Sequence, residues 1–189
     1  LEAHGVESYF AGCLSLTLEP AGLPRGPQVV LNEVPPEARD YIRGRTERPI
    51  VETVHIDKST PFGKPRFAQA RALLETYERA HCVVTTRLHC ALPCLALGTP
   101  VVLLDVAPDR GRFAGLQDYL RHHTVPAFLG WPGHLDFDQP EPNRDDFRKL
   151  ADLLRRRVGD FVAQASGSAP AVRDRTIALQ ERLNGLIAL

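Results

Sequence analysis

The stretch VVTTRLHCALPCLALGTPVVLL, residues 83–104, decides the fold class because it places a helical segment between two apolar runs. Short valine-rich runs bounded by turn-forming residues are typical of buried strands. The segment between them predicts a helix over 87–98 that ends at Gly98, since glycine commonly closes a helix. A strand, a helix and a second strand in succession predict parallel pairing with a right-handed crossover.

The same alternation continues before and after this stretch. Apolar runs predict further strands, and segments that start at proline or show helical spacing predict the helices between them. We therefore expect an α/β fold: a Rossmann-like parallel sheet with helices on both faces. The expected strands are 28–34, 49–56, 81–86 and 99–106, and the expected helices are 35–45, 66–80, 87–98 and 145–163.

Two further strands and a domain division are expected outside this repeating unit. Residues 8–18 alternate between polar and apolar types, and residues 126–131 follow a loop and a short helix, so both are expected to be strands. The chain divides into three parts. Residues 1–20 are expected to hold the end of a preceding helix and a linking strand, 28–165 the Rossmann-like domain, and 166–189 a C-terminal helix.

The composition bounds the possible functions. The 189 residues, 43% of them hydrophobic, are enough for one compact domain with its own core. Basic and acidic side chains balance at 23 each, so no overall field attracts nucleic acid or an anionic membrane. No apolar run approaches the roughly 20 residues that span a bilayer, and we expect a cytoplasmic chain. Three of the four cysteines lie in apolar segments, which favours reduced, buried thiols.

The opening residues suggest a missing part. The chain contains no methionine, and it begins LEAHGVESYF, where Gly5 follows four residues typical of the end of a helix. We therefore expect a fragment of a larger protein, in which a site shared with an upstream half is incomplete.

Polar side chains stand where a predicted strand gives way to a predicted helix. Thr85 and Thr86 are expected to cap that helix, which places Arg87 and His89 in its first turn. Ligands of open α/β sheets bind at the carboxyl ends of the strands, and the amides of a helix N-terminus favour an anion. The planar guanidinium of arginine suits phosphate or carboxylate. The same pattern also fits a solvated surface arginine and a core histidine with satisfied nitrogens.

Three segments resemble a known family: YFAGCLSLTL at 9–18, ARALLETYERAHCVVTTRLHCALPCLALGTPVVLL at 70–104 and RFAGLQDYL at 112–120. Together they look like the C-terminal half of the polysaccharide pyruvyl transferase family. The resemblance implies one half of a GT-B-type fold, in which two Rossmann-like halves face a cleft. It also implies an enzyme that moves the enolpyruvyl-derived group of phosphoenolpyruvate onto two sugar hydroxyls as a cyclic ketal, in exopolysaccharide or cell-wall polysaccharide biosynthesis.

The resemblance assigns roles to particular residues. Arg87 and His89 match the family's Arg-x-His, which implies that they contact the phosphoenolpyruvate donor. Gly12, Ser15 and Thr17 match a Gly-Cys-Leu-Thr-Leu-Thr stretch, with Ser15 in place of the usual threonine. These residues line the cleft or pack at the junction between the halves, and packing is favoured for Thr17.

Two loop arginines and a set of partners complete the expectations. Arg110 and Arg112 follow the strand that ends at Asp105, where they reach a ligand or remain solvated. The implied partners are phosphoenolpyruvate, a saccharide acceptor and an N-terminal half of the same protein. Phosphoenolpyruvate is a substrate, so no cofactor is expected, and no metal.

Three alternative interpretations of the chain remain possible from the sequence. A structural zinc site is weakly suggested by a cluster whose spacing is wrong for a zinc knuckle, made of His81, Cys82, His89, Cys90 and Cys94. A GT-B-type glycosyltransferase half would bind a nucleotide sugar, for which a carboxylate near the ribose is expected and Asp105 is the one candidate. A non-catalytic docking domain of a larger protein would retain the same fold without turnover.

Overall fold

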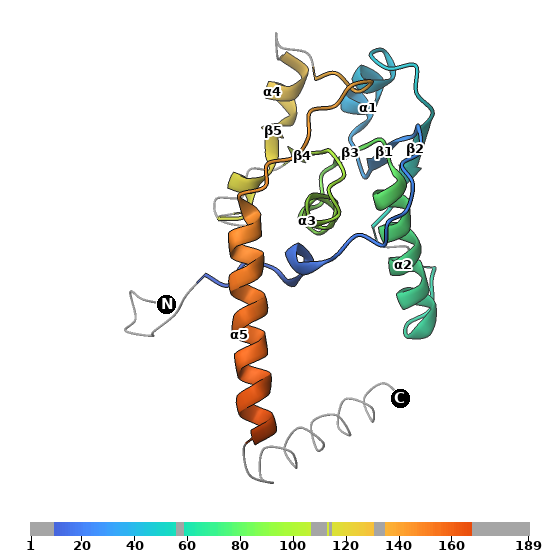
Figure 1. Cartoon of the computed structure of the whole chain (residues 1–189). Coiled ribbons are helices and arrows are strands. Elements are labelled where there is room, and N and C mark those ends of the chain that lie inside the picture. The colour runs from blue at the N-terminus through green and yellow to red at the C-terminus, as the bar shows by residue number, and fades with distance from the viewer. Residues whose placement is uncertain (1–9, 56–58, 107–112, 114, 131–134, 168–189) are drawn as a thin grey trace.

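The computed structural model describes residues 10–55, 59–106, 113, 115–130 and 135–167. Five parallel strands form one sheet in the order β2-β1-β3-β4-β5 (Figure 1). The expected α/β, Rossmann-like sheet is therefore confirmed. Its strands are β1 (Val29–Asn32), β2 (Ile50–Thr53), β3 (Cys82–Thr85), β4 (Val101–Asp105) and β5 (Arg121–Thr124).

Helices cover both faces of the sheet, because successive strand side chains point to opposite faces and both sets are apolar. Val30 and Val83 belong to one core cluster, whereas Val29 and Val84 belong to the other. The first cluster is completed by α2 (Lys64–Arg79), α3 (Leu88–Ala96), the 3-10 helix η2 (Leu14–Thr17) and α5 (Phe147–Gly167). The second is completed by α1 (Pro36–Arg43) and α4 (Val125–Gly130), and a short 3-10 helix, η3 (Gln117–Tyr119), precedes β5.

The central stretch folds as its sequence predicts. Between β3 and β4 the helix α3 begins at Leu88, and Gly98 follows it with a φ of +73°, a left-handed conformation that glycine adopts without a steric penalty. The helix expected at 145–163 is α5, which runs past the sheet so that only its first part packs on the domain (Figure 1). Most of the C-terminal helix expected at 166–189 lies outside the described residues.

The strand expected at 8–18 is wrong over the residues that the structure describes. Residues 14–17 form η2, which packs against α3 and α5 and pairs with no strand. Leu16 is buried, whereas Leu14 is 67% exposed, although both belong to the same alternating pattern. The alternation therefore reflects contact with neighbouring helices instead of a place in the sheet.

The strand expected at 126–131 is also wrong, since α4 occupies residues 125–130. Pro126 lies at the start of this helix, where a proline is well tolerated, and Val125 and Phe128 share its buried side at a spacing of three. The strand β5 comes just before it and consists of the polar residues Arg-His-His-Thr. Pairing with the free edge of β4 overrides the weak strand pattern of this segment.

No helix within the described part of the chain is both long and apolar enough to cross a membrane.

Gly12 is expected to be essential for the contact between the η2 region and α5. Its φ is +76°, and an added Cβ would lie 2.7 Å from Cδ2 of Leu150. Gly22 has a similar φ of +78°, but an added Cβ there would meet no atom within 4 Å, so Gly22→Ala measures the cost of the left-handed backbone alone. We expect Gly22→Ala to lower the free energy of unfolding by about 1 kcal/mol, and Gly12→Ala to lower it by about 2–4 kcal/mol because the overlap adds to that cost.

Urea unfolding followed by circular dichroism measures both losses. Equal losses for the two variants would contradict the packing assigned to Gly12.

Candidate functional site

The candidate site lies at the carboxyl ends of β1 and β3. These strands are neighbours in the sheet, and the chain proceeds from β1 to β2 on one side and from β3 to β4 on the other. Such a reversal of strand order leaves a crevice at the carboxyl edge, where ligands of open α/β sheets bind.

Buried polar side chains tie the three strand ends together at this edge. Thr85 donates through Oγ1 to Oδ1 of Asn32 at 3.1 Å, and Asn32 donates through Nδ2 to Oγ1 of Thr53 at 3.0 Å. Thr85 Oγ1 also accepts from the amide of Arg87 at 2.9 Å. Because Asn32 and Thr85 are fully buried, these bonds fix where the chain leaves β3.

Glu33 connects the same three strand ends through its backbone. Its φ of +53° is left-handed, which is uncommon for a residue other than glycine. Its amide donates to the carbonyl of Thr53 at 3.2 Å, and its carbonyl accepts from Oγ1 of Thr86 at 3.0 Å. These two backbone hydrogen bonds hold Glu33 in its unusual conformation at the edge where open α/β sheets place their ligands.

The carboxylate of Glu33 contacts the two chain segments that follow β2 and β3. Oε1 accepts from the amide of His55 at 2.9 Å. Oε2 accepts from Nε of Arg87 at 2.5 Å and also forms an ion pair with its Nη2. One edge of the Arg87 guanidinium is thereby occupied, and no described residue hydrogen-bonds to its Nη1. Within the described part of the chain, Nη1 is therefore available to donate a hydrogen bond to a ligand oxygen.

The pKa values of Glu33 and His55 reflect this arrangement. Burial raises the pKa of the Glu33 carboxyl, but hydrogen bonds from Arg87 and the His55 amide outweigh it and hold the pKa below its ordinary value. Burial lowers the pKa of His55, and the charges of His89 and Arg87 add to this, against the opposing charge of Glu33. His55 Nδ1 is buried with no hydrogen-bond partner in the described part of the chain, so a proton there lacks an acceptor. At neutral pH the carboxylate is ionised and the imidazole of His55 is neutral.

A groove of about 450 Å³ runs from this edge between η2, α2 and α3. Its polar lining includes His55, His89, Ser15 and Arg66, and its remaining wall is largely apolar, with Leu73 and Tyr77 among the residues. Arg87 lies beside it, close enough to His55 for its charge to lower the pKa of that ring. The groove therefore combines charged and titratable groups with a largely apolar wall.

The structure brings some of the predicted site residues together and separates others. His89 and Ser15 line the groove, and Ser15 Oγ lies 2.8 Å from Sγ of Cys13. Gly12 packs against α5, and Thr17 bonds the carbonyl of Leu14 within η2. The predicted residues Arg110 and Arg112 lie outside the described residues.

The expected helix caps need a correction. Thr85 and Thr86 do not cap α3, because the N-cap position is Arg87 and no side chain bonds there as a cap. Thr85 belongs to β3 and its buried hydroxyl positions the amide of Arg87, while Thr86 bonds the carbonyl of Glu33. Both threonines thus support the turn that carries Arg87. Asp105, considered above for a ribose contact, lies 3.7 Å from Nε2 of His122 at the end of β4.

Sequence reasoning missed Glu33 and His55. Both lie at the end of an expected strand, 28–34 or 49–56, and the observed strands end just before them, at Asn32 and Thr53, on the carboxyl edge of the sheet. Glu33 contacts Arg87 54 residues along the chain and the His55 amide 22 residues along it, and no local pattern reveals such contacts.

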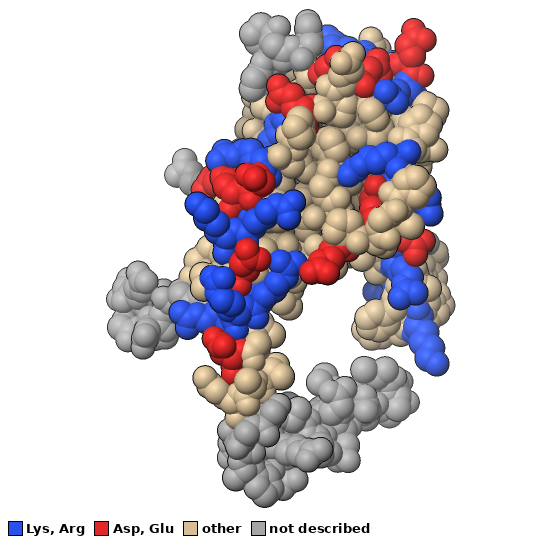
Figure 2. Space-filling model, viewed as in Figure 1, with Lys and Arg blue, Asp and Glu red and all other residues tan. Residues whose placement is uncertain are grey.

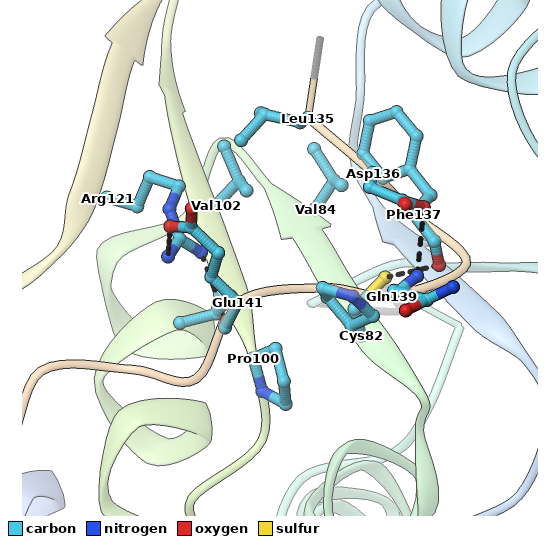
Figure 3. Close-up of a pocket in the computed structure, with 12 residues that line it drawn as sticks. Cys82, Val84, Pro100, Val102, Arg121, Leu135, Asp136, Phe137, Gln139 and Glu141 are labelled. Atoms are coloured by element: carbon cyan, nitrogen blue, oxygen red, sulfur yellow. Dashed lines mark hydrogen bonds and ion pairs between the residues drawn. The ribbon is translucent and has the colours of Figure 1, made fainter.

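A second cavity of about 190 Å³ lies under residues 135–141 on the opposite face (Figure 3). Cys82, Pro100 and Val102 line it, and an ion pair of 3.0 Å between Arg121 and Glu141 closes one side. These residues lie toward the amino ends of the strands, where this fold class does not place its ligands. Burial raises the pKa of the Cys82 thiol to about 12, so it stays protonated. Among the described residues no three histidine, cysteine or acidic side chains gather as a metal site.

The Glu33 carboxylate is expected to control the titration of His55. Replacing Glu33 by glutamine removes the negative charge that favours the imidazolium, so we expect the pKa of His55 to fall further. NMR titration of the ring protons, assigned with His55→Gln, measures this shift. Glu52→Gln is the matched control, since Glu52 pairs with Arg39 and Arg43 instead. An unchanged or higher pKa in Glu33→Gln would contradict the site geometry.

Comparison with known proteins identifies the family of the chain. No curated protein and no solved structure shows significant similarity to the chain. Residues 5–108, more than half of the chain, match the sequence profile of one family, described as polysaccharide pyruvyl transferase. The matched region contains β1 to β4 together with Glu33, His55 and the turn at Arg87. The chain therefore belongs to the polysaccharide pyruvyl transferase family.

Proposed function

We propose that the protein transfers the enolpyruvyl-derived group of phosphoenolpyruvate to a saccharide as a ketal, and that Arg87 and His89 bind this donor. The observation that carries the proposal is the turn at the carboxyl edge of β3, where Arg87 stands beside a groove that His89 lines. Family membership supports a transferase acting in polysaccharide biosynthesis.

The chemistry explains why an arginine and a histidine are needed. The methylene carbon of the donor gains a proton, the neighbouring carbon becomes an oxocarbenium-like centre, and two sugar hydroxyl oxygens bond to it as phosphate leaves. Of the two hydroxyl protons, one balances the new methyl group and the other ends on phosphate. Arg87 offsets charge on the departing phosphate or holds the carboxylate. His89 donates a proton to the leaving oxygen or binds the phosphate as imidazolium.

The surroundings of the two residues favour this chemistry. Glu33 fixes one edge of the Arg87 guanidinium, so its orientation is set before a ligand arrives. The neutral His55 nearby is available to accept a proton from an attacking hydroxyl. The largely apolar wall of the groove suits the apolar part of the donor at the reacting carbon.

The proposal also defines partners and location. The reaction redistributes bonds without net oxidation, so it requires no redox cofactor. The acceptor is a saccharide, and an N-terminal half of the same protein is proposed to complete the cleft. We also propose that the reaction takes place in the cytoplasm.

Calorimetric titration with phosphoenolpyruvate tests the proposal. We expect the protein to bind it, and Arg87→Ala or His89→Ala to weaken binding by roughly tenfold or more, since each removes a hydrogen bond to a charged group. Arg43→Ala is the matched control, because Arg43 also pairs with a carboxylate, Glu52, but lies on α1 away from the groove.

Titration with UDP separates the alternatives. Binding of UDP without phosphoenolpyruvate would favour a nucleotide-sugar glycosyltransferase. Binding of neither compound would contradict the donor site proposed here.

A further inference from the structure

Arg66 is a second arginine at the same groove, and it lies on a different element from Arg87. It lies in the first turn of α2 and lines the groove together with His55 and His89. Figure 2 shows an open gap between the projecting ends of α2 and α5, with basic side chains along the outer side of α2. Arg66 is thus placed to meet a ligand that enters beside His89.

The guanidinium of Arg66 is held by contacts that leave its charge unopposed. Its Nε donates to the carbonyl of Thr60 at 3.2 Å, and its Cζ lies 5.4 Å from the ring centroid of Phe62. Neither contact neutralises a cation, and no carboxylate pairs with Arg66 among the described residues. The contacts therefore orient the charge without cancelling it.

Among the described residues around the groove, the arginines differ in whether a carboxylate pairs with them. Arg87 is compensated by Glu33, and His55 is neutral at neutral pH because burial lowers its pKa. Among the described residues that line the groove, Arg66 is an arginine without a carboxylate partner, and with His89 beside it this favours an anionic ligand that carries a second negative group.

We propose that Arg66 is a specificity-determining residue that binds the second anionic group of the donor, so that the groove selects a ligand carrying both a phosphate and a carboxylate. This inference rests on the proposed function, since phosphoenolpyruvate carries these two groups. One group lies with Arg87 and His89, and the other lies with Arg66. A planar guanidinium donates two parallel hydrogen bonds to a phosphate or a carboxylate, so the assignment holds for both orientations of the donor.

The preference for phosphoenolpyruvate over compounds with one anionic group can therefore be measured. Inorganic phosphate and pyruvate each carry one of the two anionic groups, so neither engages both arginines. We expect the protein to bind phosphoenolpyruvate roughly tenfold or more tightly than either compound, the size expected from one added hydrogen bond between charged groups.

The test is a calorimetric comparison of phosphoenolpyruvate, inorganic phosphate and pyruvate with the protein and with Arg66→Gln. We expect Arg66→Gln to weaken phosphoenolpyruvate binding by roughly tenfold, and to remove most of the preference over the two single anions. Arg71→Gln is the matched control, since Arg71 is exposed on the same helix but does not line the groove and its loss changes the net charge equally. Arg71→Gln is expected to bind phosphoenolpyruvate within about twofold of the unaltered protein.

Each outcome decides the inference. A thermal unfolding midpoint of Arg66→Gln that matches that of Arg71→Gln establishes that Arg66→Gln is folded. If Arg66→Gln binds phosphoenolpyruvate as Arg71→Gln does, while Arg87→Ala does not bind it, the inference is overturned and the proposed function survives. If Arg66→Gln weakens all three compounds equally, Arg66 contributes only a general field and the selectivity is overturned. If the unaltered protein binds no phosphoenolpyruvate, the proposed function fails and this inference fails with it.

Discussion

The carboxylate of Glu33 is the contact on which the site depends. One oxygen fixes the amide of His55 after β2, and the other fixes the guanidinium of Arg87 after β3. The buried bonds among Asn32, Thr53 and Thr85 hold the strand ends beneath it in register. A parallel sheet brings its strand ends to a common edge, and these polar contacts turn that edge into a positioned set of side chains.

The same contacts decide the electrostatics of the groove. An arginine that faces water alone would bind many anions, whereas Glu33 cancels much of the charge of Arg87 and fixes its direction. Arg66 has no such carboxylate among the described residues, and it lies on a different element. Charge at the groove is therefore divided between a compensated, oriented arginine and an uncompensated one. This division favours a ligand with two separated anionic groups over a single phosphate.

Sequence reasoning predicted the centre of the fold because local signals agree there. Residues 82–105 combine valine-rich strands, a helix and Gly98, and each has the conformation its pattern predicts. The strand wrongly expected at 8–18 and the missed strand β5 both lie where the local sequence pattern disagrees with the neighbouring elements. Residues 14–17 alternate like a strand but have only helices to pack against, and β5 is polar but has a free sheet edge to pair with.

The candidate site was predictable only in part for a related reason. Arg87 and His89 stand at a strand-to-helix turn, a position that one stretch of sequence reveals. Glu33 and His55 act through contacts across 22 and 54 residues, and the left-handed backbone of Glu33 has no sequence signature. Arg66 lies in a helix whose pattern marks it as exposed, so only the neighbouring elements show that it borders the groove.

A crystal structure of the protein with phosphoenolpyruvate bound tests the central claim most directly. The account predicts that the donor lies at the carboxyl edge of β1 and β3, in contact with Arg87 and His89, while Glu33 still holds the far edge of the Arg87 guanidinium. A donor bound in the cavity beside Cys82, or elsewhere on the surface with Arg87 untouched, would contradict it.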